Sequence, residues 1–160
     1  MKQIRNGFTF VEMIVVIGIL AIVASFSFSY SLTSQRHATQ DTTMDTLISD
    51  IKQQQLKAML KDTEGRATAD SYGVYFEQNR YTLFHGATFT SQPENFVVDL
   101  TTAEQFSAIN LPSSQIVFAP GSGEVSNFSA GQQTFILRNT QTNQQKTVTI
   151  NQVGSITQIQ

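Results

Sequence analysis

The residue with the clearest chemical consequence is Glu12, a carboxylate at the start of an apolar run. The run covers residues 13–24, and a short leader with Lys2 and Arg5 ends at Gly7 ahead of it. A charged side chain carried unpaired to the centre of a bilayer costs roughly 2.5–3.5 kcal/mol. Glu12 therefore needs a cationic partner or a place at the water interface, which makes it a candidate interaction residue.

Other residue types that carry catalysis or bind metals are absent or scattered. The chain has no cysteine, which excludes disulfides, cysteine-based metal sites and cysteine nucleophiles. His37 and His85 lack acidic residues at ligand spacing, and no serine lies in a cluster with His and Asp. Asp41, Asp45 and Asp50 do not follow the spacing of a calcium loop. We expect no catalytic residue, no metal and no cofactor, so the chain is interpreted as a non-enzyme.

The length and charge of the chain narrow the class of protein. Its 160 residues are enough for one domain of modest size, and its formal net charge is −2. After Lys146 the chain carries no charged side chain. Contacts with phosphates need Lys or Arg, so nucleic acid is not expected as a partner.

The N-terminal segment has the pattern of a membrane helix with a defined orientation. Residues 13–35 carry no charge, and the mostly apolar part of this segment is near the lower limit for crossing a bilayer. Lys2 and Arg5 precede it, whereas the next basic residue is Arg36. Because basic residues stay inside, we expect the N-terminus in the cytoplasm and the C-terminal part to be exported.

Three interpretations of this segment compete. A secretory signal peptide would be cut near the small residues Ser25 and Ser27, but its apolar stretch would be long and would begin with an acid. A plain signal anchor leaves Glu12 unexplained. The third interpretation is a leader that is cut before the apolar run, between Gly7 and Phe8.

The junction itself favours the third interpretation. Gly7 followed by residues 8–12 (Phe-Thr-Phe-Val-Glu) resembles the class III signal of type IV pilins and pseudopilins, although that family often has Leu where Phe10 stands. The resemblance implies cleavage after Gly7 by prepilin peptidase and N-methylation of Phe8. It also implies that Glu12 meets the N-terminal amine of a neighbouring subunit and so sets the register of assembly. The alternative for Glu12 is that its side chain reaches the membrane interface.

The remaining residues predict a long helix followed by strands. No Pro or Gly occurs between Gly18 and Gly65, which favours one helix over residues 8–61. Its second half has an apolar stripe at helical spacing, made of Met44, Leu47, Ile48, Ile51, Ala58 and Met59. Strands are expected at 72–76 and 80–84 as a hairpin, then at 96–100, 115–118, 134–138, 146–150 and 155–157. The sequence thus predicts an α+β fold, in which a long N-terminal helix packs on a C-terminal antiparallel β-sheet domain.

The order of these strands resembles one branch of the family, the GspH/FimT-like minor pseudopilins and pilins. The matching segments are 72–76, 81–84, 116–121 and 147–156. The resemblance implies a minor subunit of a type II secretion pseudopilus or of a type IV pilus. Expected partners are other pilin or pseudopilin subunits, prepilin peptidase, the inner-membrane assembly platform and membrane lipid.

These expectations divide the chain into four parts. Residues 1–7 are the leader, 8–34 the transmembrane and fibre-core half of the helix, 35–64 its amphipathic half, and 65–160 the β-rich domain. The protein is expected to cross the inner membrane once, with its C-terminal domain in the periplasm, and to join a fibre. The alternative is a membrane-tethered binding domain outside any fibre, such as an adhesin or a DNA receptor.

Overall fold

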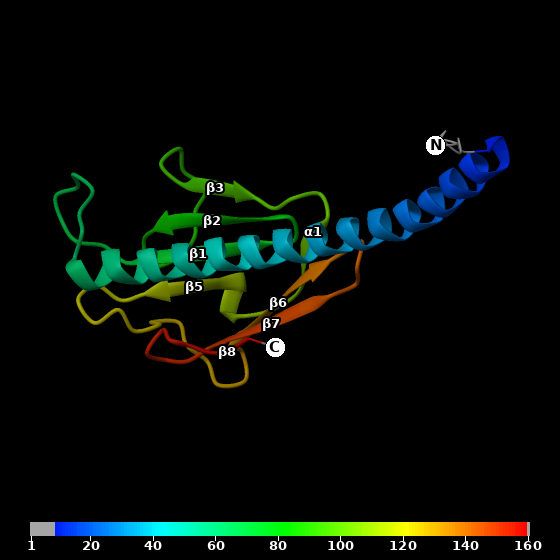
Figure 1. Ribbon diagram of the computed structural model, residues 1–160. Coiled ribbons are helices and arrows are strands. Elements are labelled where there is room, and N and C mark those ends of the chain that lie inside the picture. Colours follow the sequence, from blue (N-terminus) through cyan, green and yellow to red (C-terminus); the bar gives the residue numbers. More distant parts are fainter. Residues whose placement is uncertain (1–8, 160) are drawn as a thin grey trace, which may run out of the picture. The chain divides into compact units, whose positions relative to one another are not determined.

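Helix α1 (Phe10–Leu60) is the dominant element of the chain (Figure 1). The computed structural model describes residues 9–159, except for the side chains of residues 25–40. The chain divides into two compact units, Met1–Thr39 and Gln40–Gln160, and α1 contributes to both. The bounds of α1 confirm the prediction of one helix over residues 8–61, with Phe8 outside the described residues.

The Gln40–Gln160 unit contains two antiparallel sheets, which confirms the α+β class. Sheet A has the order β3-β2-β1-β5, formed by β1 (Tyr72–Glu77), β2 (Arg80–His85), β3 (Phe96–Asp99) and β5 (Gln115–Phe118). Sheet B has the order β4-β6-β7-β8, formed by β4 (Glu104–Asn110), β6 (Thr134–Asn139), β7 (Gln145–Ile150) and β8 (Ile156–Ile159). A 3₁₀ turn, η1 (Pro112–Ser114), leads into β5.

The predicted strands are present, and β4 is an addition that the sequence pattern does not predict. The hairpin of β1 and β2 pairs Glu77 with Arg80, so two residues form its loop. β4 is irregular because its register against β6 shifts between Phe106 and Ala108. Such a bulge interrupts the alternation of apolar and polar residues by which strands are recognised. With β4 included, the antiparallel strands of the domain form two sheets of four strands each.

The second half of α1 lies along the strands of these sheets (Figure 1). It packs on them through a narrow buried stripe. The stripe follows helical spacing and consists of Met44, Leu47, Ile51, Gln54 and Ala58. Ile48 is partly buried beside it. The predicted stripe is therefore confirmed up to Ala58, whereas Met59 is 47% exposed. One member of the stripe, Gln54, is polar.

Hydrogen bonds attach the end of α1 to two loops. The Ala58 carbonyl accepts a hydrogen bond from the Gly121 N–H at 2.8 Å. Gln55 Nε2 donates to the carbonyl oxygens of Gly123 at 2.9 Å and Val153 at 2.8 Å. These bonds fix the end of the helix against the turn after β5 and the turn before β8.

Two further hydrogen bonds connect α1 to the strands themselves. The Tyr81 hydroxyl donates to Asp50 Oδ2 at 2.6 Å, and the Thr43 hydroxyl donates to Glu104 Oε2 at 2.8 Å. Burial, together with the adjacent Asp50, raises the pKa of Tyr81, so its hydroxyl keeps the proton that it donates. The helix is thus bonded to β2 in sheet A and to β4 in sheet B.

Aromatic rings fill the space where the two sheets meet. Phe76 of sheet A lies with its ring centroid 5.3 Å from that of Phe106 and 4.8 Å from that of Phe135, both in sheet B. Phe106 and Phe135 are 5.9 Å apart in an edge-to-face arrangement. Such aromatic pairs add to the free energy gained from burial alone.

We predict that Leu47→Ala strongly destabilises the Gln40–Gln160 unit. Leu47 is 0% exposed, and truncating a fully buried leucine costs about 2–5 kcal/mol. The matched control is Leu56→Ala, because Leu56 lies on the same helix and is 53% exposed; its cost should stay near about 0.5 kcal/mol. Chemical denaturation followed by circular dichroism measures both. Equal losses would show that the stripe does not hold the helix.

Candidate functional site

The first turn of α1 is closed by a cap that involves Thr9 and Glu12. The Thr9 carbonyl accepts the first helical hydrogen bond, from the Met13 N–H at 3.2 Å. The Thr9 hydroxyl oxygen accepts a second one from the Glu12 N–H at 3.3 Å. A threonine before the helix with a glutamate three residues later is the pattern of a capping box. This pattern is readable in the sequence but is not among the predictions made from it.

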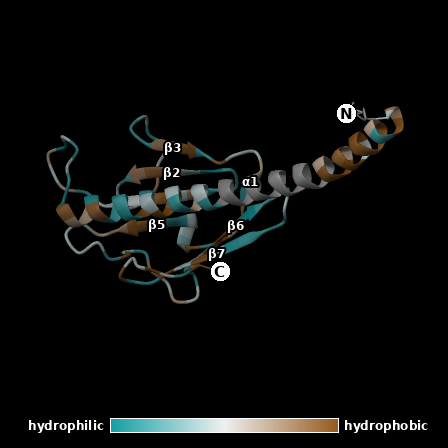
Figure 2. Cartoon of the chain, viewed as in Figure 1, coloured by the Kyte–Doolittle hydropathy of each residue, from teal (hydrophilic) through white to brown (hydrophobic). Residues whose placement is uncertain are grey.

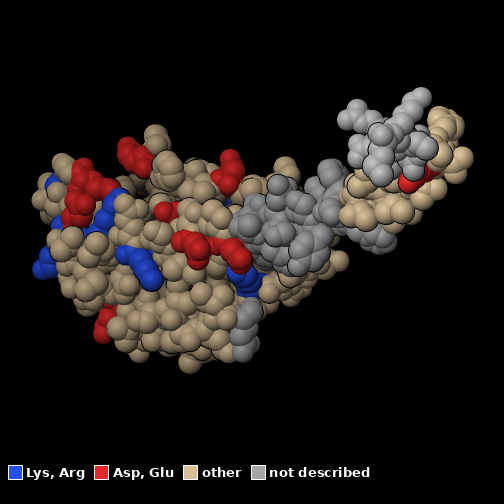
Figure 3. All heavy atoms as spheres, viewed as in Figure 1, with Lys and Arg blue, Asp and Glu red and all other residues tan. Residues whose placement is uncertain are grey.

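Glu12 is exposed at the positive end of the helix dipole, where a carboxylate is stabilised. It is the only charged residue between Thr9 and Ala24, and Figure 3 shows a single red patch on this part of the chain. The other predicted site residues, Gly7 and Phe8, lie outside the described residues. Cleavage, methylation and subunit pairing therefore remain predictions.

The start of α1 is apolar on every side. All side chains from Phe10 to Ala24 are exposed, and most residues of this stretch are hydrophobic (Figure 2). The exposed fraction of Phe10 reaches 80%. A helix without a polar face is normally covered by lipid or by other protein. These residues therefore need a cover that their own unit does not provide.

Within residues 9–24 and 41–159, no helix has both the length and the apolar character needed to cross a membrane.

Comparison with known proteins supports a specific interpretation of the N-terminal segment. Residues 2–28 match the family described as the prokaryotic N-terminal methylation motif. The match includes the basic residues of the leader, the Gly7–Phe8 junction, Glu12 and the whole apolar run at 13–24. The motif indicates a type IV pilin-like protein that is processed as a prepilin. No curated protein and no solved structure matches the chain.

Histidine and acidic side chains are not arranged as a metal site in the part of the chain that the structure describes. No group of three or more such residues is placed to hold an ion there. His85 bonds locally, with Nδ1 3.2 Å from Asp70 Oδ2. The side chain of His37 lies outside the described residues.

Two buried polar residues, Gln54 and Glu104, are absent from the predictions. Each has a side-chain oxygen, Oε1, without a hydrogen-bond partner among the described residues. The second carboxylate oxygen of Glu104 accepts from the hydroxyls of Thr43 and Thr101, at 2.8 and 2.9 Å. The burial of Gln54 could have been predicted from the sequence, because the residue occupies a position of the stripe between apolar residues. The burial of Glu104 could not be predicted from the sequence, because it involves a contact with Thr43 of α1, 61 residues away along the chain.

An ionic cluster follows the end of α1. Glu64 accepts from Lys57 Nζ at 2.6 Å and from Arg66 Nη1 at 3.1 Å. Arg66 also donates to the Tyr72 hydroxyl at 2.7 Å, and that hydroxyl donates to the Asp62 carbonyl at 2.8 Å. The hydrogen bond from Lys57 lowers the pKa of Glu64; partial burial opposes this shift, and Arg66 adds to it. The two ion pairs of Glu64 therefore stabilise the loop that joins α1 to β1 while Glu64 is ionised, in addition to the hydrogen bonds of Tyr72.

We predict that Glu64→Gln makes the unfolding midpoint less sensitive to acid. The pKa of Glu64 is lower in the folded state, so its stabilisation is complete at pH values above 4.5, the ordinary pKa of a glutamate. The stabilisation is then lost as the pH falls through the folded-state pKa. The ion pairs of Glu64 are partly exposed, so the stabilisation that is lost in acid should stay below about 1 kcal/mol. Thermal unfolding between pH 7 and pH 3 measures it, with Glu124→Gln as the control. Identical acid slopes in wild type and Glu64→Gln would refute the role of the cluster.

Proposed function

We propose that this chain is a minor pilin or pseudopilin subunit of the GspH/FimT-like kind. It would be assembled into a type II secretion pseudopilus or a type IV pilus. The observation that carries the proposal is the start of α1, an all-round apolar surface with one carboxylate in its first turn, inside the matched motif. The role is structural, because the proposed activity is assembly and requires no catalytic residue.

The proposed life cycle assigns a task to each part of the chain. Prepilin peptidase removes residues 1–7 and methylates Phe8. Residues 8–34 cross the inner membrane, with the N-terminus in the cytoplasm, and later form the fibre core among other subunits. Residues 35–64 attach this core to the β-rich domain at 65–160, which lies in the periplasm.

Glu12 would specify the register of neighbouring subunits. After cleavage, the amine of Phe8 is a cation close to the start of α1. A carboxylate among apolar side chains is costly until an opposite charge reaches it. Only a subunit at the correct stagger brings its N-terminal amine to Glu12, so the cost of the lone charge selects one arrangement.

The C-terminal residues favour an assembly role over DNA binding. Lys146 is the last charged residue of the chain, and its Nζ contacts Asp41 Oδ1. The turn after β7 and strand β8 are formed by neutral residues. Binding of a nucleic acid backbone depends on Lys and Arg, which this end of the chain lacks.

We predict that the mature protein begins at Phe8 and carries one N-methyl group. The experiment expresses the full chain in a host with a prepilin peptidase and measures the intact mass and the N-terminal peptide by mass spectrometry. Gly7→Leu is the control and should remain uncut, because the residue before the bond must be small. A wild-type protein that starts at Met1 or near Phe26 would contradict the proposal.

We predict that Glu12→Gln is cut normally but is incorporated poorly into fibres. Glutamine keeps the length and the backbone N–H of residue 12 and removes only the charge. Thr9→Ser is the matched control, because serine preserves the cap at the same turn. Sheared fibre fractions probed by immunoblot compare both variants with wild type. Normal incorporation of Glu12→Gln would exclude charge pairing as the register device.

A further inference from the structure

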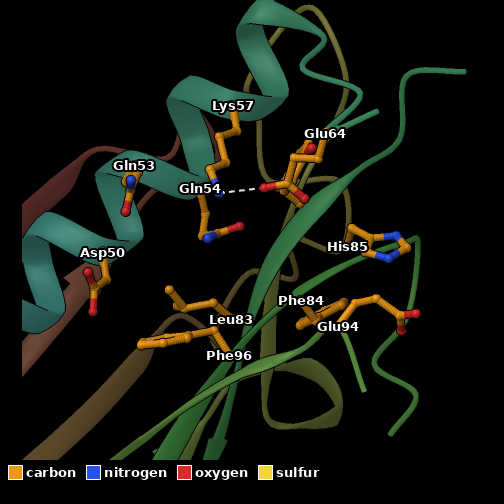
Figure 4. A pocket seen from close by; sticks show the side chains of 11 residues that line it. Asp50, Gln53, Gln54, Lys57, Glu64, Leu83, Phe84, His85, Glu94 and Phe96 are labelled. Carbon is orange, nitrogen blue, oxygen red and sulfur yellow. Dashed lines mark hydrogen bonds and ion pairs between the residues drawn. The ribbon is translucent and has the colours of Figure 1, made fainter. Parts of the chain in front are cut away.

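A pocket of about 270 Å³ lies between the second half of α1 and strands β2 and β3 (Figure 4). All of its lining belongs to the Gln40–Gln160 unit. Its volume is below the about 300–1,000 Å³ that is typical of small-molecule sites. The pocket therefore suits a single side chain. The residues that decide what it accepts are Asp50, Gln54, Leu83, Phe84, Glu94 and Phe96.

Gln54 provides a hydrogen-bond acceptor that the chain itself leaves unused. The residue is 3% exposed, and its Oε1 has no hydrogen-bond partner among the described residues. Figure 4 shows its side chain extending from the helix into the pocket. A buried carbonyl without a partner is unfavourable, so an occupant that donates a hydrogen bond to it gains free energy.

The charges around the pocket favour a cation. Asp50 accepts a hydrogen bond from Tyr81, but among the described residues no cation is paired with it. The Glu94 carboxylate has no ion pair in the same set. The lysine of the pocket, Lys57, is bound to Glu64 at 2.6 Å. Negative charge therefore remains uncompensated on two walls.

The apolar wall suits a cationic side chain with a flat head. Phe96 is 65% exposed and lies at the pocket beside the buried Leu83. Arginine covers apolar surface with its methylene groups, and its guanidinium stacks on aromatic rings. Its planar group also donates several hydrogen bonds at once, which an ammonium group does with less directional precision.

Asp50 and Gln54 can reach the same guest. They are one helical turn apart on α1, and residues at this spacing are neighbours on the helix surface. Figure 4 shows both side chains extending toward the side of the pocket where Leu83 and Phe96 lie. A carboxylate, an amide oxygen and an aromatic ring are thus arranged around one space.

We propose that this pocket receives an arginine side chain from another protein chain. The guanidinium donates to Gln54 Oε1, pairs with Asp50 and stacks on Phe96, while Glu94 adds negative charge at the opposite wall. The partner is defined by this exposed arginine. The site lies within one unit, so the proposal does not depend on cleavage of the leader or on assembly into a fibre.

The test titrates the full chain, ¹⁵N-labelled in detergent micelles, with the peptide acetyl-Gly-Arg-Gly-amide. The control peptide has citrulline, a neutral isostere, in place of arginine. The arginine peptide should produce saturable NMR shifts of the Gln54 side-chain amide and the Phe96 backbone amide. The citrulline peptide should not. Equal responses to both peptides, or no response to either, would overturn the proposal.

Variants test the two groups on α1 separately. Asp50→Asn retains an acceptor for Tyr81 and should weaken binding of the arginine peptide about threefold, a typical effect of losing a partly exposed ion pair. Glu124→Gln removes a charge outside the pocket and should leave binding unchanged. Unchanged affinity of Asp50→Asn, or an equal loss in Glu124→Gln, would refute recognition by the pocket.

Gln54→Leu separates binding from stability. Because Gln54 Oε1 has no partner in the described chain, leucine should keep or raise the thermal unfolding midpoint while it weakens binding of the arginine peptide. A lowered midpoint with unchanged affinity would show that Gln54 serves the fold and not the pocket. The Asp50→Asn comparison decides the proposal even if Gln54→Leu does not fold.

Discussion

The contact between the buried stripe of α1 and the two sheets is the constraint on which the Gln40–Gln160 unit depends. Leu47 and Ile51 are fully buried, and their burial sets both the rotation and the position of the helix. A helix is rigid over such distances, so every other side chain on it is placed as a consequence. Asp50 and Gln54 reach the pocket beside β2 and β3 because the stripe fixes the helix there. Gln55 meets two loops for the same reason.

The same helix has two different sources of stability. Residues 44–58 gain theirs from burial against strands of their own chain. The residues from Phe10 to Ala24 are exposed throughout, and a cap at Thr9 closes the first turn of the helix there. Hydrogen bonds within a helix and a cap add little stability to an isolated helix, because most helical stability in proteins comes from packing. An apolar cover over residues 10–24, of lipid or of other protein, would add the packing that their exposed side chains lack.

Patterns of neighbouring residues predicted most helices and strands. Strand β4 and the pocket were missed because they depend on contacts between residues far apart in the sequence. The absence of Pro and Gly between Gly18 and Gly65 predicted α1, and two strand-like segments on either side of a short polar turn predicted the first hairpin. Strand β4 could not be found in this way, because its bulge breaks the alternation and its first residue, Glu104, is a buried acid. The motif with Glu12 could be recognised in the sequence because its residues are adjacent. The pocket could not, because Gln54 and Phe96 come together only in the folded chain.

The bonds at the end of α1 have a mechanical consequence. Gln55 and Ala58 lie within one helical turn, and together they bind Gly121, Gly123 and Val153 from two loops distant in sequence. A pull on α1 would act on these bonds until they rupture, because they connect the end of the helix to both loops. Resistance to pulling is governed by the rate of such a rupture and not by equilibrium stability. The helix thus transmits force to the middle and the C-terminal end of the chain at the same time.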